Sequence, residues 1–343
     1  MNIPVIAFFN NKGGVGKTSL VYHLAWMYHD LELRVVTADF DPQANLTAAF
    51  LDEDRLEEIW EKEDDSYNTV YRCIRPLIRG VGDIAGPQLE RIEDGLHLLV
   101  GDLQLSGFED DLSAEWPGCL DRKERSFRII SAFWRLLSKA RESCSADVVL
   151  VDLGPNLGAI NRAALIAADY VVVPLSPDLF SLQGLKNLGP TLQRWREEWQ
   201  ERYRKNPAPD LYLPQGKMQP VGYVVLQHGV RFDRPVKAFQ RWIVRIPQIY
   251  NDKVALKHGK ANVALADDPN CLALLKHYQS LMPMAQEARK PIFYLKPADG
   301  AIGAHVYAVK NVYGDFKCLA RKIAEQTGLR LPSEPLLPES ESG

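Results

Sequence analysis

A glycine-rich loop with two lysines lies near the start of the chain, between an apolar segment and an amphipathic one. Residues 4–9 are apolar and predict a short buried strand, and the apolar residues of 17–29 recur at helical spacing. Between them the sequence reads Asn10-Asn11-Lys12-Gly13-Gly14-Val15-Gly16-Lys17-Thr18. Glycines allow successive backbone N–H groups to curl around a phosphate chain, and the N-terminus of the next helix adds positive partial charge. The segment therefore predicts a P-loop that binds phosphate groups.

The side chains of this loop predict how a nucleoside triphosphate is held. Lys17 is expected to meet the β- and γ-phosphates, and the Thr18 hydroxyl is expected to bind Mg²⁺. The loop departs from the strict G-x-x-x-x-G-K-[ST] motif, because Asn11 takes the first glycine position and Lys12 adds a second cation. The predicted nucleotide-binding residues of the loop are Asn11, Lys12, Gly13, Gly14, Val15, Gly16, Lys17, Thr18 and Ser19.

Carboxylates follow two further predicted strands. Residues 34–38 predict a strand that leads into Asp39-Phe40-Asp41-Pro42-Gln43-Ala44-Asn45. Residues 147–152 predict another strand, which ends at Asp152. Because ligands of open α/β sheets bind beyond the carboxyl ends of the strands, these carboxylates are expected beside the phosphates.

Each carboxylate has its own expected role. Asp152 is expected to hold Mg²⁺, and Asp41 is expected to position or activate the attacking water. Asp39 is expected to support the metal or Lys17; the alternative is a capping residue before a proline turn. The predicted metal-binding residues are Thr18, Asp39 and Asp152, and the predicted catalytic residues are Lys12, Lys17 and Asp41.

These motifs together give the chain a family resemblance. The form K-G-G-x-G-K-T at 12–18 and the segment D-x-D-P-Q-x-N at 39–45 resemble those of the ParA/MinD family of deviant Walker A ATPases. Within that family the chain is most similar to the ParA/Soj-like partition branch. The resemblance covers residues 1–50 and 145–190 well.

The resemblance implies roles that the residues alone do not. In this family the early lysine, here Lys12, reaches across a dimer interface to the partner's nucleotide. Pro174, at the end of a further predicted strand, is implied to shape the nucleotide pocket. Gly154 stands where the family commonly has a proline, so the loop after Asp152 is expected to switch differently.

The strand pattern predicts the fold class. Apolar segments at 170–174 and 221–226 add two strands, and helical stretches separate all of these strands. Such alternation is typical of an α/β fold with a doubly wound, mostly parallel sheet. The predicted organisation is one P-loop ATPase domain at 1–330, with an acidic insertion at about 51–125, a basic insertion at about 231–280 and a disordered tail at 331–343.

Composition excludes several other classes of protein. The 46% hydrophobic content is that of a globular chain, and no run of about 18 apolar residues predicts a membrane span. Five cysteines form no CxxC pair, so neither a zinc ribbon nor a redox motif is indicated. We expect a cytoplasmic, bacterial-type protein that associates with the nucleoid only where it binds DNA.

A basic stretch predicts a surface for an acidic partner. With a formal net charge of −3, DNA binding needs a local patch rather than overall charge. Cations recur every three to four residues and are expected on one helical face, at Arg231, Arg234, Lys237, Arg241 and Arg245. The patch is expected to bind DNA non-specifically; the alternatives are a solvated helix face and an interface to an acidic protein.

The sequence leaves three functions to weigh. The first is an ATPase switch, in which ATP joins two subunits, the homodimer binds DNA or a ParB-like activating protein, and slow, partner-stimulated hydrolysis resets it. Such a switch would serve DNA partition, cargo positioning, or a defence or mobile-element system. The second is an ATP-dependent ligase or synthase, and the third is a scaffold that binds nucleotide without hydrolysis. Lys12 and the Asp41-Pro42-Gln43 turn favour the first.

Overall fold

The apolar segments of the sequence pair as strands of one sheet. The computed structural model describes residues 3–61, 68–226, 241–257, 263–276, 278 and 280–332. The strands of this described part are β1 (Val5–Phe8), β2 (Val35–Asp39), β3 (Glu90–Glu93), β4 (Leu96–Leu99), β5 (Val148–Asp152), β6 (Tyr170–Leu175), β7 (Gln219–Leu226) and β8 (Cys271–Leu275). They lie in the order β3-β4-β2-β5-β1-β6-β7-β8, and every pairing is parallel except that of β3 with β4. The predicted mostly parallel α/β fold is confirmed.

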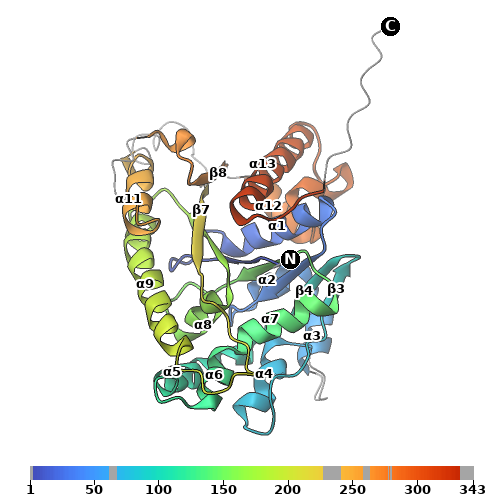
Figure 1. Cartoon of the computed structure of the whole chain (residues 1–343). Helices are drawn as coiled ribbons and strands as arrows, with labels where there is room; N and C mark the ends of the chain where they lie inside the picture. The colour runs from blue at the N-terminus through green and yellow to red at the C-terminus, as the bar shows by residue number, and fades with distance from the viewer. Residues whose placement is uncertain are drawn as a thin grey trace.

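Helices cover both faces of this sheet (Figure 1). The α-helices of the described residues are α1 (Lys17–Asp30), α2 (Asn45–Phe50), α3 (Glu53–Glu61), α4 (Val70–Ile78), α5 (Phe108–Gly118), α6 (Glu124–Ile130), α7 (Ala132–Ser143), α8 (Ala159–Ala167), α9 (Leu179–Tyr203), α11 (Ile246–Lys253), α12 (Leu281–Ala288) and α13 (Ala304–Thr327). Short 3-10 turns are η1 (Leu103–Gly107), η2 (Leu265–Asp267), η3 (Ile292–Tyr294) and η4 (Pro297–Asp299).

The alternation of side chains along the strands divides the core into two layers. Successive residues of a strand point to opposite faces of the sheet. Ala7 of β1 therefore packs in the layer of α4 to α9, whereas Ile6 and Phe8 pack in the layer of α1 and α13. Both layers are apolar because each face of the sheet is covered by helices.

The predicted acidic insertion contributes to the sheet itself. Within 51–125, β4 pairs in parallel with β2, and β3 extends the edge beyond it. Residues 231–280 likewise supply α11 and the edge strand β8. Four- or five-residue strands give too little alternation to be recognised among the charged residues around them. The domain and insertion boundaries stay a prediction.

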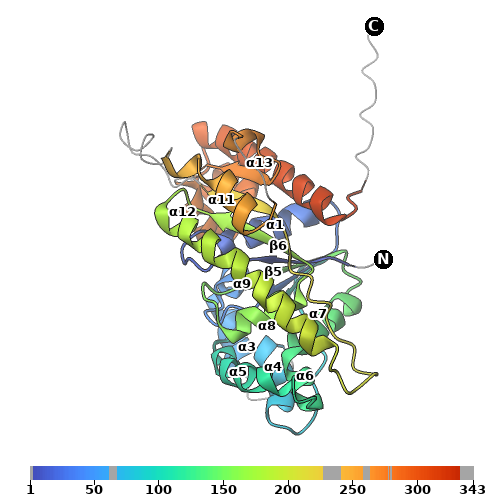
Figure 2. The same ribbon diagram turned by 60° about the vertical axis from the view of Figure 1, so that its left-hand side comes forward.

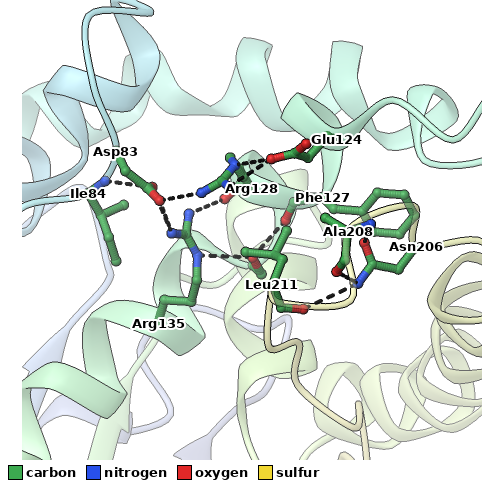
Figure 3. A network of polar contacts seen from close by, with 10 residues as sticks. Asp83, Ile84, Glu124, Phe127, Arg128, Arg135, Asn206, Ala208 and Leu211 are labelled. Carbon is green, nitrogen blue, oxygen red and sulfur yellow. Dashed lines mark hydrogen bonds and ion pairs between the residues drawn. The ribbon is translucent and has the colours of Figure 1, made fainter.

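A salt-bridge cluster fixes the loop that follows α4. Both oxygens of Asp83 accept from the Arg135 guanidinium of α7 at 2.7 Å, and one oxygen also accepts from Arg128 of α6 at 2.6 Å. Arg135 in turn donates to the Arg128 carbonyl at 2.8 Å. Figure 3 shows the two arginines converging on this carboxylate. The side chain of Arg135 is only 12% exposed, so this pair is better shielded from water than an ordinary surface ion pair.

A buried histidine joins α1 to the C-terminal part of the chain. Nδ1 of His23 lies 2.7 Å from the Ser19 carbonyl oxygen, and Nε2 accepts from the Ile292 N–H at 3.1 Å. This pair of contacts requires a neutral ring with its proton on Nδ1. Burial lowers the pKa of His23 to about 4.

Among the described helices, none combines the length and the apolar character needed to cross a bilayer. Cys73, Cys119 and Cys271 are buried, whereas Cys318 is exposed.

Replacement by alanine should affect stability in opposite directions at Gly189, where α9 packs against α11, and at Gly314 of α13. A Cβ added at Gly189 would lie 1.6 Å from the Lys253 carbonyl oxygen, whereas one at Gly314, within α13, meets nothing within 4 Å. We expect Gly189→Ala to lower the free energy of unfolding by about 1–3 kcal/mol, because backbone must move. Gly314→Ala should raise it by about 0.5–1 kcal/mol through helix propensity. Chemical denaturation measures both, and equal effects of the two changes would contradict this packing.

His23 predicts a pH dependence of stability. Its pKa is 6.5 as a free side chain and about 4 in the folded chain. As pH falls from 6.5 towards 4, the unfolded state takes up a proton that the folded state cannot, so stability is lost by up to about 3 kcal/mol. A His23→Gln variant has no titrating ring at this position, so its stability does not fall for this reason as pH is lowered. The difference in unfolding free energy between wild type and variant should therefore shrink from pH 7 to pH 4.5; a constant difference would refute the neutral, buried assignment.

Candidate nucleotide-binding site

The glycine-rich loop joins the end of β1 to the first residue of α1, Lys17. Gly14 and Gly16 have φ of 69° and 81°, a region that favours glycine over residues with a Cβ. A Cβ at Gly16 would also lie 2.7 Å from the Leu226 side chain. Gly13 and Gly14 are exposed, so their backbone is open to a ligand. The strand, loop and helix lie where the sequence placed them.

Asn10 anchors the start of this loop to β6. Its Nδ2 donates to the Pro174 carbonyl at 2.7 Å, and its Oδ1 accepts from the Lys12 N–H at 3.0 Å. Pro174 is itself buried and supports the loop from behind rather than lining the cleft. Of the other predicted loop residues, Ser19 lines the cleft, whereas the Val15 side chain is fully buried in the protein.

Lys17 is held beside carboxylates inside the protein. Its side chain is buried, and its Nζ lies 3.4 Å from the Lys12 carbonyl oxygen. Burial lowers the pKa of Lys17, while the nearby charges of Asp152 and Asp41 act in the opposite direction. The ammonium therefore lies between the phosphate loop and the two aspartates, as its expected role requires.

Lys12 forms an ion pair within its own chain. Its ammonium contacts Asp178, which directly precedes α9. The other oxygen of Asp178 accepts from the Ser181 N–H at 2.9 Å and so caps the helix. No local pattern in the sequence indicated that this carboxylate holds both Lys12 and the start of α9.

Thr18, Asp152 and Asp39, the predicted metal-binding residues, lie together at the ends of β2 and β5 and the start of α1. The Thr18 hydroxyl donates to Asp152 Oδ2 at 2.6 Å, and Asp39 is paired in register with Asp152 across β2 and β5. Burial, together with neighbouring aspartates, raises the pKa of both carboxyls. Among the described residues, the buried Oδ1 of Asp152 has no hydrogen-bond partner. A divalent cation fits here, since it would satisfy this oxygen and offset the two buried charges.

Asp39 differs from Asp152 in how its oxygens are used. Oδ2 of Asp39 accepts from both the N–H and the hydroxyl of Thr47 at 2.8 Å, and Oδ1 accepts from the Asp41 N–H at 3.2 Å. These bonds hold the turn between β2 and α2. They favour a supporting role for Asp39 over direct ligation of a cation.

Asp41 lies between the phosphate loop and the loop after β5. Its Oδ1 accepts from the Gln43 N–H at 3.0 Å, which fixes the carboxylate in the cleft. A Cβ built on Gly154 would lie 3.2 Å from this oxygen. The glycine that departs from the family pattern therefore makes room for the aspartate.

A cleft of about 710 Å³ extends from the phosphate loop between α1, α2 and α12. Beyond the loop residues, its wall includes Tyr22, Gln43, Met282 and Arg289. The sequence did not indicate Met282 of α12 or Arg289, the residue after this helix, because both are far from the phosphate loop in the chain and belong to no motif.

The predicted DNA surface is described only in part. Arg231, Arg234 and Lys237 lie outside the described residues. Arg241 and Arg245 are exposed, and their guanidinium carbons lie 4.4 and 5.7 Å from the centre of the Trp242 ring. Arg241 and Arg245 do not lie on one continuous helix, because residues 244–245 form a turn before α11 begins. DNA binding stays a prediction.

Comparison with known proteins adds to this geometry. Residues 3–205 match the family model described as "AAA domain". The chromosome partitioning protein ParA of Caulobacter vibrioides is 30% identical over 194 residues, which are 57% of this chain and 64% of that protein. The sporulation initiation inhibitor protein Soj of Bacillus subtilis is 28% identical over 184 residues, 54% of this chain and 62% of Soj. The chain thus spans less than two thirds of the length of these relatives.

Solved structures resemble almost the whole chain. Protein DIP2308 of Corynebacterium diphtheriae is 25% identical, with a TM-score of 0.67 over 94% of this chain and 98% of that one. A Borrelia burgdorferi protein described as a plasmid partition protein, bound to AMPPNP, shares the fold at 16% identity, with a TM-score of 0.57 over 95% and 100%. The chain therefore belongs to this AAA-domain family and, within the ParA/MinD family of P-loop ATPases, to the ParA and Soj partition branch.

Proposed function

We propose that this chain binds Mg²⁺–ATP in the cleft and hydrolyses it to ADP and phosphate. One observation supports this most strongly: Lys17, the Thr18–Asp152 pair and Asp41 converge at the end of one cleft, beside a loop with open backbone N–H groups. Phosphoryl transfer is catalysed mainly by positioning and by electrostatic stabilisation, and these groups supply both.

The position of each residue in the cleft suggests its role in the proposed hydrolysis. The loop N–H groups and Lys17 bind the phosphates and stabilise the charge that develops on the γ-phosphoryl group. Thr18 and Asp152 would hold Mg²⁺, which supplies positive charge to the phosphate oxygens, and Asp39 would support them. Asp41 orients the attacking water, because its carboxylate is fixed by Gln43 at the cleft.

ATP would also join two copies of the chain. Apolar side chains around the phosphate loop are exposed: Phe180 by 72%, Leu179 by 43% and Leu157 by 38%. Lys12 and Asp178 lie beside them, so this face presents both an apolar surface and a cation able to reach a second nucleotide. Hydrolysis would then separate the dimer. Turnover is slow and partner-stimulated in this proposal, because the reaction acts as a timer.

The dimer would act on cargo through its other surfaces. Its relatives are described as partitioning proteins, and DNA partition or cargo positioning is the proposed role here. Exposed Arg241 and Arg245 support non-specific DNA binding by counterion release, and a ParB-like protein is the proposed activator. The competing function is an ATP-dependent ligase or synthase. It requires a second substrate for turnover, whereas the switch hydrolyses ATP alone.

Removal of the Asp41 carboxylate should separate ATP binding from hydrolysis. We expect Asp41→Ala to lower kcat for phosphate release about 100-fold, because the water loses its orienting group. The Kd for ATP should change less than about threefold, since the phosphate loop is untouched. Asp54→Ala, which removes an exposed carboxylate of α3, is the matched control. Wild-type kcat in Asp41→Ala would show that the water-positioning role is misassigned.

A charge at the apolar rim should block the dimer. We expect Phe180→Asp to keep ATP binding yet stay monomeric with ATP, because a carboxylate in the interface would be desolvated without a partner. Tyr212→Asp is the matched control: it is 77% exposed and lines a separate pocket with Asp169, which precedes β6 at the opposite edge of the sheet. Size-exclusion chromatography with light scattering measures both. Full dimerisation of Phe180→Asp would place the interface elsewhere.

A further inference from the structure

A carboxylate from α5 holds the N-terminus of α8. Oε1 of Glu109 accepts from the Ala159 N–H at 2.5 Å, and Oε2 accepts from the Ile160 N–H at 2.8 Å. Gly158, the residue before the helix, provides no side-chain cap of its own. A Cβ there would lie 2.6 Å from Glu109 Oε1, so glycine is what permits the approach. Glu109 thus satisfies two of the unpaired N–H groups with which every helix begins.

Helix α8 in turn fixes the loop that follows Asp152. Asn161, buried in the first turn of α8, donates to the carbonyls of Gly154 at 2.9 Å and Asn156 at 2.7 Å. The Asn156 side chain accepts from the Gly158 N–H at 2.9 Å. A shift of the helix N-terminus must therefore move residues 153–158 with it.

This loop faces the reacting end of the cleft. Pro155 lines the cleft, and its Cγ lies 3.8 Å from the position of a Cβ built on Gly13. Gly154 lies against Asp41, as described above. The contacts from Glu109 to Asp41 are therefore continuous: α5, α8, the loop after β5, and the aspartate.

Helix α5 is braced by its surroundings. Ser126 of α6 donates to Glu115 at 2.5 Å, and α6 is itself joined to α7 through Asp83 (Figure 3). Two guanidinium groups, those of Arg162 from α8 and Arg202 from α9, each lie 4.1 Å from the centre of the Trp116 ring. Figure 2 shows α5 and α6 beside α8 below the sheet. Such a frame can hold Glu109 in place.

We propose that Glu109 is a positioning residue for ATP hydrolysis, which sets the loop at 153–158 against Asp41 by holding the N-terminus of α8. This inference rests on the proposed ATPase function. It also gives α5, which belongs to the 51–125 stretch, a direct connection to the site. In a Glu109→Gln variant the neutral side chain keeps its size but has only one accepting oxygen, and its NH₂ group would face a backbone N–H.

The test uses Glu109→Gln in the full chain, with Asp110→Asn as the matched control. Asp110 is the next residue of α5, is exposed, and undergoes the same change of charge. We expect Glu109→Gln to lower kcat for ATP hydrolysis about five- to tenfold, with KM and the Kd for ATP within about twofold of wild type. Hydrogen exchange should rise at 153–160 in Glu109→Gln and stay unchanged in Asp110→Asn.

Two results would overturn the inference. One is unchanged exchange at 153–160 with unchanged kcat. The other is a parallel loss of kcat, ATP affinity and melting temperature, which indicates a purely structural cap. Glu109→Asp, which keeps the charge, should recover part of kcat; it also serves if Glu109→Gln folds poorly. If wild type hydrolyses no ATP, the proposed function fails on its own, and the exchange measurement still decides whether Glu109 positions the loop.

Discussion

The site depends on compensation between buried charges of opposite sign. Lys17 is buried beside Asp41 and Asp152, and Asp39 and Asp152 lie side by side at the ends of two parallel strands. Buried charges are tolerated only when they are paired or bound to a cation. The lysine therefore needs the carboxylates, and the carboxylates in turn favour a divalent cation. A phosphate chain with its Mg²⁺ would complete this set of charges.

Parallel pairing brings these charges together. β5 lies between β1 and β2, so the phosphate loop, Asp152 and the Asp39–Asp41 turn emerge at the same edge of the sheet. The Lys12–Asp178 pair stands at the rim of this edge, where both side chains are about 30% exposed. An ion pair of this exposure contributes only about 0–1 kcal/mol. Lys12 can therefore leave Asp178 at little cost when it binds a phosphate of the second subunit, as we propose.

The sequence indicated the parts of the site that lie close together in the chain. The phosphate loop is visible because strand, glycines, lysine and helix follow one another, and Asp39, Asp41 and Asp152 are visible because each follows an apolar run. Asp178, Glu109 and Met282 were not visible, since each acts on a segment that only folding brings near. The short strands β3, β4 and β8 were missed for a different reason: four or five residues give too little alternation to be recognised, and three of the four residues of β3 are charged. The basic helical face was expected from spacing alone, and a turn at 244–245 interrupts it.

The central claim is that ATP, and not ADP, joins two copies of this chain into a form that binds a partner. The most direct measurement is the molar mass of the wild-type protein by light scattering without nucleotide, with ADP and with ATP, followed by binding of a random-sequence duplex at low and moderate salt. The account predicts the 38.7 kDa monomer without nucleotide and with ADP, and about twice that mass with ATP alone. DNA affinity should appear with the dimer and fall steeply with salt. A mass that does not depend on ATP would contradict the role given to Lys12 and to the exposed rim around it.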